Sequence, residues 1–301
     1  MRAFLFPGQG SQAVGMGAAL AEASRAARDT FQEVDEALGQ NLFKLMREGP
    51  EDELKLTENA QAAIMAHAIA VFAALTKEGG VELRKAAQFV AGHSLGEYSA
   101  LCAAGTFALP NTAKLLKIRG QAMQAAVPVG VGAMAALLGA DVELANKIAE
   151  AAAKGEVCEV ANDNDPSQVV LSGHAGAIER AIGMAKEMGA KRAVQLPVSA
   201  PFHCSLMQPA AEAMADALSY EVLQAPAVPL YANVTAQPTS DPDTIRSQLV
   251  EQVTGMVRWR ESIANMAAAG VDEFVELGGK VLGPMVKRIA PEAKVTSVVT
   301  I

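Results

Sequence analysis

Residues 89–97 read FVAGHSLGE, and this stretch decides how the chain folds. An apolar run ends at Gly92, and Gly92 and Gly96 flank Ser94 on either side before an apolar segment begins. The pattern G-x-S-x-G between a strand and a helix is typical of a sharp turn that projects a serine from the edge of a parallel sheet. We therefore expect a strand over residues 88–91 and a helix over residues 95–104, with Ser94 on the turn between them.

Short apolar runs alternate with helical periodicity on both sides of this turn. Strands are expected at residues 3–6, 228–231 and 273–277, and helices at residues 24–38, 57–76, 112–126, 206–218, 244–253 and 258–269. The helix at 57–76 is almost entirely apolar or small, so it should lie in the core. This alternation predicts an α/β fold with a mainly parallel sheet and helices on both faces.

The middle of the chain follows a different order of elements. Strands are expected at residues 132–138, 157–161, 169–172 and 193–198, helices at 142–153 and 175–188, and a turn at 162–166. The order β-α-β-β-α-β is the ferredoxin-like pattern. We therefore expect a hydrolase-like α/β domain built from residues 1–127 and 199–301, interrupted by a small ferredoxin-like subdomain at residues 128–198.

Composition restricts the classes of protein to consider. The 301 residues are 51% apolar and 19% charged, which predicts a substantial core, and the net charge of −8 argues against a nucleic-acid binder. Three cysteines, Cys102, Cys158 and Cys204, fit neither a zinc site nor a disulfide framework, so reduced thiols in a cytoplasmic protein are expected. No signal peptide is expected, and no stretch approaching the roughly 20 apolar residues of a membrane span.

Ser94 has two possible roles. It can be a nucleophile, since amides at the start of the following helix favour developing negative charge. It can also cap that helix, because the run from Ser94 to Glu97 matches a capping box in which Glu97 reaches back to the main chain. The sequence leaves both roles open.

A serine nucleophile needs a general base, and the chain has four histidines. His67 lies within the apolar helix, His174 is expected to be exposed near a helix start, and the side chain of His93 should point away from that of Ser94. His203, in the stretch SAPFH (residues 199–203), is therefore the candidate base by elimination. The alternative is that His203 is an ordinary loop histidine.

No carboxylate presents itself to orient this histidine. The acids considered between the serine and His203 are Asp141, Asp163 and Asp165, which are expected in a helix cap and a turn. Their absence from a triad argues against an ordinary serine hydrolase. A carbonyl or amide oxygen could orient the ring instead.

Arg119 falls on the apolar face of the helix at 112–126, with Leu115, Leu116 and Met123. A guanidinium on a core-facing stripe is costly unless it is paired, and it binds carboxylates with two parallel hydrogen bonds. An anionic substrate is one possible partner. A snorkelling side chain or an internal salt bridge is the alternative.

The motifs, taken in order, resemble those of one enzyme family. They are FPGQGSQ (residues 6–12), GHSLGE (92–97), Arg119 with Gln121 and Met123, GVGAM (130–134), NDN (162–164), PFH (201–203) and GGKVL (278–282). The family is the malonyl-CoA:acyl carrier protein transacylases, the stand-alone acyltransferases of fatty-acid synthesis. Gly279 stands where a proline is common in that family.

The resemblance implies a set of catalytic roles. Ser94 would carry the malonyl group as an ester, with His203 as the general base and then the acid. Arg119 would bind the malonyl carboxylate. The backbone amides of Gln9 and Leu95 would form the oxyanion hole.

The resemblance also implies what surrounds this machinery. The main-chain carbonyl of Gln252 would orient the histidine, which agrees with the missing acid. Met123, Asn162 and Phe202 would be possible pocket residues, with Phe202 crowding a branched methylmalonyl group.

Malonyl-CoA and an acyl carrier protein are the implied partners, with CoA as a product and no bound cofactor or metal. A monomer is expected, with neither a membrane nor a nucleic acid as a partner. The carrier protein would dock on a local basic patch to which Lys114, Lys117, Arg192 and Lys280 are candidates to contribute.

Other functions remain open on the sequence. An acyltransferase serving a polyketide synthase, or a component of a malonate decarboxylase, would carry nearly the same motifs. A thioesterase is disfavoured by the missing acid and by Arg119. A catalytically silent binding protein is disfavoured by the presence of both Ser94 and His203.

Overall fold

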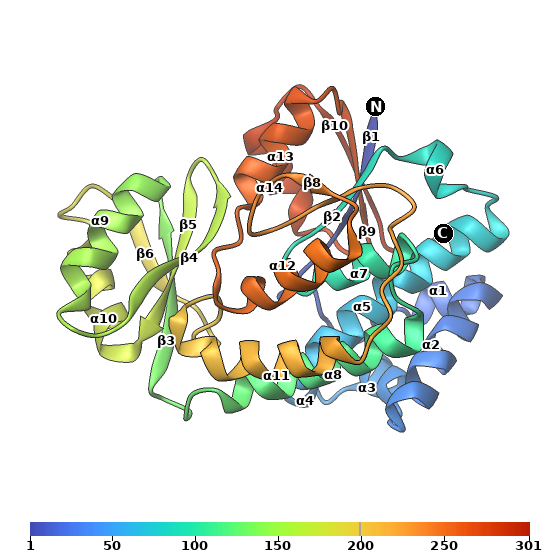
Figure 1. The fold of residues 1–301 in the computed structure, drawn as a ribbon, viewed down its shortest axis with the longest axis horizontal. Helices are drawn as coiled ribbons and strands as arrows, with labels where there is room; N and C mark the ends of the chain where they lie inside the picture. Colours follow the sequence, from blue (N-terminus) through green and yellow to red (C-terminus); the bar gives the residue numbers. More distant parts are fainter. Residues whose placement is uncertain (199) are drawn as a thin grey trace.

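The structure, a computed structural model, describes residues 1–198 and 200–301, and its centre is a six-stranded sheet (Figure 1). Neighbouring strands are parallel except at one edge, where β8 runs antiparallel to β7. In spatial order, β10-β9-β1-β2-β7-β8, the strands are Lys294–Val298, Glu273–Leu277, Arg2–Phe6, Phe89–Gly92, Leu230–Tyr231 and Pro238–Thr239. The predicted parallel core is confirmed, while β8 and β10 were not predicted.

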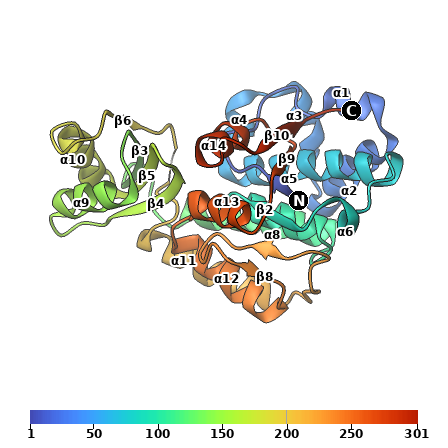
Figure 2. The same cartoon turned by 90° about the horizontal axis from the view of Figure 1, so that it is seen from above.

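Helices cover both faces of this sheet, as expected (Figures 1 and 2). The α-helices around it are α1 (Ala18–Ala23), α2 (Arg25–Leu38), α3 (Leu42–Glu48), α4 (Glu51–Lys55), α5 (Thr57–Ala73), α6 (Leu83–Ala86), α7 (Gly96–Ala103), α8 (Leu109–Ala125), α11 (Gln208–Ser219), α12 (Pro242–Thr254), α13 (Trp259–Ala268) and α14 (Leu282–Ile289). A π-helical turn (Ala74–Glu78) continues α5, and a 3₁₀ turn (Ser205–Met207) precedes α11. We call this sheet and its helices the body.

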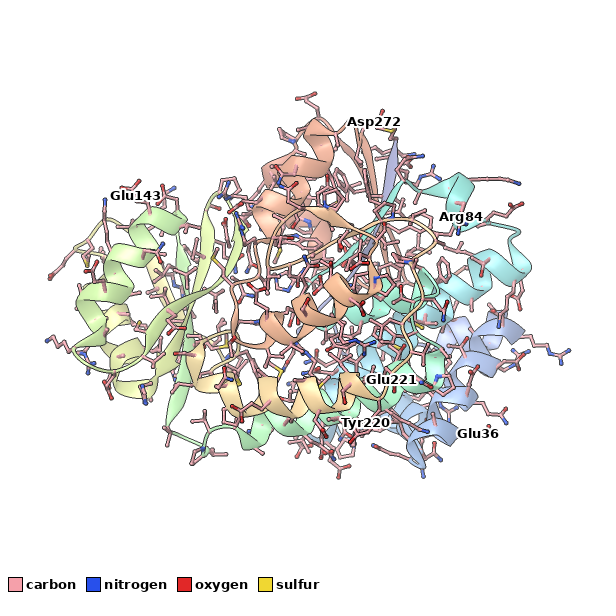
Figure 3. The ribbon with its side chains drawn as sticks, viewed as in Figure 1. Glu36, Arg84, Glu143, Tyr220, Glu221 and Asp272 are labelled. Carbon is pink, nitrogen blue, oxygen red and sulfur yellow. The ribbon has the colours of Figure 1, made fainter. Side chains whose placement is uncertain are left out.

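The alternation of side chains along β1 divides the core of the body in two. Phe4 and Phe6 join the large cluster that contains α2, α5, α8 and α11. Ala3 and Leu5 point to the other face and join the cluster that contains α13 and α14. Charged side chains such as Glu36 and Arg84 are exposed at the periphery (Figure 3).

Helix α5 crosses the middle of the body and packs closely on α8. A Cβ added at Gly120 of α8 would lie 2.6 Å from the Cα of Glu58, so the backbones of the two helices touch at this point. The segment Thr57–Glu78 is long and apolar enough to span a membrane, contrary to our expectation for the chain. In the structure 83% of its most apolar window is buried inside the protein, as in the core helix of a globular domain.

The middle of the chain folds into a separate four-stranded antiparallel sheet, which we call the insert (Figure 1). Its elements are β3 (Gly132–Leu138), α9 (Val142–Ala153), β4 (Cys158–Asp165), β5 (Gln168–His174), α10 (Ala175–Ala185) and β6 (Arg192–Gln195). The order β-α-β-β-α-β is confirmed, and the sheet has its own apolar core. The boundaries of the insert at 128 and 198 stay a prediction, and residue 199 lies outside the described residues.

The predicted turn at residues 162–166 was placed too early, since the structure has this turn at residues 166–167. Strand β4 continues to Asp165, and both Asp163 and Asp165 are buried. Oδ2 of Asp163 lies 2.8 Å from Nη2 of Arg260 on α13, and Oδ2 of Asp165 lies 2.8 Å from Nε of Arg288 on α14. The polar composition that suggested a turn reflects ion pairs with the body.

Main-chain contacts bind the same part of β4 to the body. The N–H of Asp163 donates to the carbonyl of Val257 at 2.9 Å, and the N–H of Val257 donates to the carbonyl of Ala161 at the same distance. Insert and body are therefore joined by backbone hydrogen bonds as well as by ion pairs.

The three cysteines are unpaired, as expected. Burial raises the pKa of each of the thiols of Cys102, Cys158 and Cys204 to about 11. They are therefore protonated at neutral pH and poor nucleophiles.

Candidate active site

Ser94 stands on a strained turn between β2 and α7. Its φ is 53°, in the left-handed region that non-glycine residues rarely adopt. A Cβ added at Gly92 would lie 1.9 Å from the carbonyl carbon of Gly96, and one added at Gly96 would lie 2.2 Å from the carbonyl oxygen of Phe6. The two glycines of the motif thus allow the turn to fold tightly on itself and against the end of β1.

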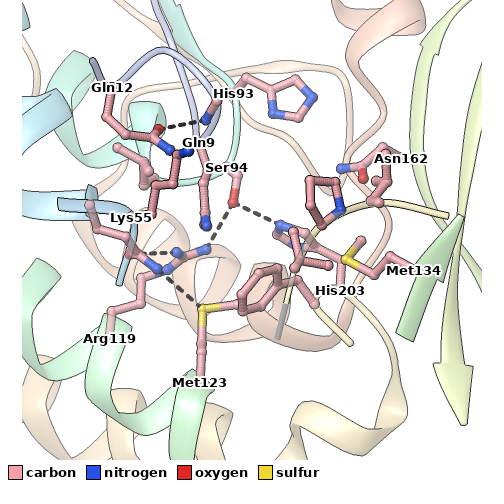
Figure 4. A pocket seen from close by; sticks show the side chains of 17 residues that line it. Gln9, Gln12, Lys55, His93, Ser94, Arg119, Met123, Met134, Asn162 and His203 are labelled. Atoms are coloured by element: carbon pink, nitrogen blue, oxygen red, sulfur yellow. Dashed lines mark hydrogen bonds between the residues drawn. The ribbon is translucent and has the colours of Figure 1, made fainter. Parts of the chain in front are cut away.

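The hydroxyl of Ser94 lies between a histidine and an arginine (Figure 4). Its Oγ is 2.7 Å from Nε2 of His203 and 3.1 Å from Nη2 of Arg119. Because arginine is only a donor, the hydroxyl accepts from Arg119 and is free to donate to the histidine. The sequence predicted all three residues, and the structure brings them together.

His203 is buried and neutral. Its Nδ1 lies 2.8 Å from the main-chain carbonyl oxygen of Gln252, which must accept, so Nδ1 carries the proton and Nε2 is the free base. Burial, and then the nearby charge of Arg119, lowers the pKa of His203 from 6.5 to about 3. The neutral ring is the form that takes a proton from a serine hydroxyl.

Arg119 is buried but forms no salt bridge among the described residues. Nη1 donates to Oε1 of Gln61 and Nη2 to Oε1 of Gln252, both at 2.8 Å, and its guanidinium carbon lies 5.8 Å from the centre of the Tyr98 ring. All of these neighbours are uncharged, and within the described part of the chain Nε has no hydrogen-bond partner. The cation is therefore available to an anionic ligand, and the alternative of an internal salt bridge was wrong.

The alternative that Ser94 and Glu97 form a capping box was wrong. The N–H of Ser94 donates to Oδ1 of Asn233 at 2.8 Å, and Glu97 does not reach back to it. Glu97 is instead buried, where Oε1 accepts from the main-chain N–H of Asn233 at 2.9 Å and Oε2 contacts Nε2 of Gln252. Burial raises the pKa of Glu97 to about 8, so it is mostly protonated at neutral pH.

Asn233 was missed by the sequence reasoning. It follows β7, the strand beside β2, and besides its bond to the N–H of Ser94 its Nδ2 donates to the carbonyl of Gly92 at 2.7 Å. One carboxamide thus holds the main chain on both sides of the turn. The available signal was the position of Asn233 at the carboxyl end of a strand, where parallel sheets place their sites.

Gln61 was missed as well. It belongs to the apolar helix α5, and its side chain is buried against Arg119. A polar residue within a mostly apolar helix was the signal that could have found it.

A cavity of about 370 Å³ opens above Ser94. The body contributes Gln9, Leu95, Met123 and Phe202 to its lining, and the insert contributes Met134, Asn162 and residues 196–198. Every predicted site residue except Gln252 lines this cavity, and Gln252 lies behind His203 and Arg119.

Two main-chain amides at this cavity have no acceptor. The N–H groups of Gln9 and Leu95 donate to no other group within the described part of the chain. The loop that carries Gln9 packs directly on the turn, since a Cβ added at Gly8 would lie 2.6 Å from the carbonyl oxygen of His93. Free amides near a serine nucleophile are what an oxyanion hole requires.

Comparisons with known proteins agree with this site. The family model described as "Acyl transferase domain" matches residues 3–281. The malonyl CoA-acyl carrier protein transacylase of Escherichia coli (strain K12) is 45% identical over 288 residues, which cover 95% of this chain and 92% of the relative.

Solved structures give the same result. The acyl-carrier-protein-S-malonyltransferase from Bartonella henselae is 54% identical with a TM-score of 0.97, covering 99% of this chain and 95% of that one. A malonyl-transacylase solved in complex with its type II PKS acyl-carrier protein is 38% identical with a TM-score of 0.96, covering 100% and 96%. The chain therefore belongs to the acyl transferase family, within the group of malonyl CoA-acyl carrier protein transacylases.

Proposed function

We propose that this protein transfers a malonyl group from malonyl-CoA to the phosphopantetheine thiol of an acyl carrier protein, through a malonyl ester on Ser94. One observation carries the proposal: the Ser94 hydroxyl lies between a neutral histidine at 2.7 Å and an arginine at 3.1 Å that has no anionic partner among the described residues. The first neighbour serves the chemistry and the second serves recognition of the acyl group.

In the first half-reaction, Nε2 of His203 takes the proton of Ser94 as Oγ attacks the thioester carbonyl. The amides of Gln9 and Leu95 stabilise the oxyanion that forms. The carbon–sulfur bond then breaks, and the CoA sulfur leaves with the proton from His203. Ser94 now holds the malonyl group as an ester.

The second half-reaction runs the same steps with a different thiol. His203 takes the proton of the phosphopantetheine thiol, and the thiolate sulfur attacks the ester carbonyl. The bond to Oγ of Ser94 breaks, and Oγ recovers the proton from His203. The number of protons on the enzyme is unchanged after a complete cycle.

The position of Arg119 matches the shape of a malonyl group. In malonate, one methylene separates the reacting carbonyl from the carboxylate, so the group that binds the carboxylate must lie close to the nucleophile. Nη2 of Arg119 lies 3.1 Å from Oγ of Ser94. A neutral acyl group would leave this buried charge without a partner, which costs about 1–3 kcal/mol or more.

The main-chain carbonyl of Gln252 supports a transferase over a hydrolase. It occupies the place at Nδ1 of His203 where a hydrolase triad has a carboxylate. We propose the apolar side chains of Met123 and Phe202, with Asn162, as the wall that receives the malonyl methylene and disfavours branched groups.

The biological setting is part of the proposal. We propose a cytoplasmic monomer with no resident cofactor that supplies chain-extender units for fatty-acid synthesis, with the carrier protein docked on exposed basic residues. Lys114, Arg192 and Lys280 are exposed. Lys117 contributes less, because its ammonium group already contacts Glu58 and hydrogen-bonds to two neighbouring amide side chains.

Intact-protein mass spectrometry tests the proposal. The protein is mixed with malonyl-CoA and then chased with an acyl carrier protein that bears phosphopantetheine. We expect a malonyl adduct on Ser94 that moves to the carrier thiol, no adduct in Ser94→Ala, and a normal adduct in Ser99→Ala, which removes a buried hydroxyl from α7. Loss of the adduct as free malonate, faster than its transfer, would instead indicate a hydrolase, and no adduct at all would overturn the proposal.

A further inference from the structure

Glu97 has no part in the mechanism above, yet it is buried beside it. The described charged or titratable groups that act on it are Arg119 on α8 and Tyr98 on its own helix. The residues that contact it from α12 and from the loop after β7 are both uncharged: Gln252 through its side-chain amide and Asn233 through its main-chain N–H. The feature to explain is a buried carboxyl near a buried guanidinium with no salt bridge between them.

The carboxamide of Gln252 lies between the two groups. A guanidinium can only donate hydrogen bonds, so the oxygen Oε1 of Gln252 must face Arg119, at 2.8 Å. The amide nitrogen Nε2 must then face the other way, where it contacts Oε2 of Glu97 and donates to the main-chain carbonyl of Ser94 at 3.0 Å. The orientation of Gln252 is therefore fixed from both sides.

We propose that Glu97 is a specificity-determining positioning residue. Through its contact with Nε2 of Gln252, it holds Gln252 in the orientation that presents an uncharged amide oxygen to Arg119, so that Arg119 keeps its positive charge for the carboxylate of the incoming acyl group. This proposal rests on the malonyl transfer proposed above.

The charge state of Glu97 is the variable in this arrangement. A carboxylate at this position would compensate the charge of Arg119, and because both side chains are buried the Coulomb interaction between them would be strong. An anionic acyl group would then gain less from binding to Arg119, while a neutral acyl group would be affected far less. Burial raises the pKa of Glu97 to about 8, so the preference for an anionic acyl group should weaken as the pH rises through that value.

The test compares acylation of Ser94 by malonyl-CoA and by acetyl-CoA between pH 6.5 and 9.5, in single turnovers. In the wild type, we expect the malonyl-to-acetyl ratio of the acylation rates to fall by about fivefold to tenfold from pH 7 to pH 9.5. In Glu97→Gln, which cannot ionise, the ratio should stay within about twofold across the range. The matched control is Glu143→Gln, an exposed carboxylate on α9 (Figure 3), which should follow the wild type.

The outcomes separate the two proposals. Absence of any malonyl adduct in the wild type overturns both. A normal adduct with the same fall of the ratio in Glu97→Gln overturns the role of Glu97 alone, as does an equal loss of rate for both acyl donors with an unchanged pH course. If Glu97→Gln fails to fold, Glu97→Met takes its place: it cannot ionise, so its ratio should also stay constant with pH, but at a lower value, because a thioether does not hold the amide nitrogen of Gln252.

Discussion

Nδ1 of His203 donates a hydrogen bond of 2.8 Å to the main-chain carbonyl oxygen of Gln252. A carbonyl orients the ring but, unlike a carboxylate, brings no net negative charge to stabilise the protonated imidazole. The ring is buried, and the cationic Arg119 lies nearby. Both the burial and this positive charge favour the neutral form of His203. The pH dependence of the reaction should show this directly.

The first prediction concerns that pH dependence. With the pKa of His203 at about 3 in place of 6.5, kcat/KM for acylation should remain flat as the pH falls from 7 to 5, because the base stays unprotonated. The unfolded state binds more protons than the folded state between pH 6.5 and 3, so the fold loses stability as the pH falls through that interval. Stopped-flow acylation, paired with thermal melts at each pH, measures both effects. Loss of half the acylation rate near pH 6.5 in a folded protein would contradict the assignment.

The second prediction concerns Arg119. Arg119→Ala removes the cation beside Ser94, so malonyl transfer should fall by about 100-fold or more while acetyl transfer changes little. Single-turnover acylation by the two CoA esters gives the ratio. Arg84→Ala removes an exposed arginine on α6 (Figure 3) that does not line the cavity, and it should leave both rates unchanged. Equal losses for the two donors would show that Arg119 does not select the acyl group.

The third prediction uses two glycines in helices. A Cβ at Gly120 would meet the backbone of α5 at 2.6 Å, whereas a Cβ at Gly183 in α10 meets nothing within 4 Å. Gly120→Ala should therefore destabilise the fold, and Gly183→Ala should stabilise it by about 0.5–1 kcal/mol through helix propensity. Chemical denaturation of both variants compares them. If Gly120→Ala were as stable as Gly183→Ala, α5 and α8 would not be in backbone contact.

The fourth prediction concerns the bond between insert and body. Asp163 is buried and Arg260 is partly exposed, so their ion pair is shielded from solvent on one side only. A double-mutant cycle of Asp163→Ala and Arg260→Ala should give a coupling free energy of about 1–3 kcal/mol, below the cost of breaking a fully buried pair. The free energy of unfolding in denaturant measures it. Additive effects of the two substitutions would mean that the pair does not hold the insert in place.

Much of the architecture was readable from periodicity. The predicted helix at 142–153 and the predicted strands at 132–138 and 273–277 have the bounds observed in α9, β3 and β9. Their apolar side chains recur with the period of a helix or of a strand, so the local pattern alone predicts the element that the structure contains.

The misreading at Asp163 and Asp165 has a physical cause. Both residues favour turns in isolation, and the arginines that stabilise them in a strand lie about 100 residues or more further along the chain. A single sequence shows no link between such distant partners.

The site was predicted unevenly for the same reason. Ser94 and Arg119 carry local signals, namely a glycine-flanked turn and a charge on an apolar face. The carbonyl of Gln252 carries none, because every residue has one, and only the resemblance suggested it. Asn233 acts through ordinary carboxamide hydrogen bonds, and its importance depends on the strand order that places β7 beside β2.

The cavity has walls from two structural units, and this has an evolutionary consequence. Ser94, His203 and Arg119 all belong to the body, whereas Met134 and Asn162 come from the insert. Mutations in the insert can therefore reshape its side of the cavity while the reacting atoms keep their places. A lineage that diverges toward new acyl donors can therefore do so by substitutions in the insert, while its catalytic residues stay constant.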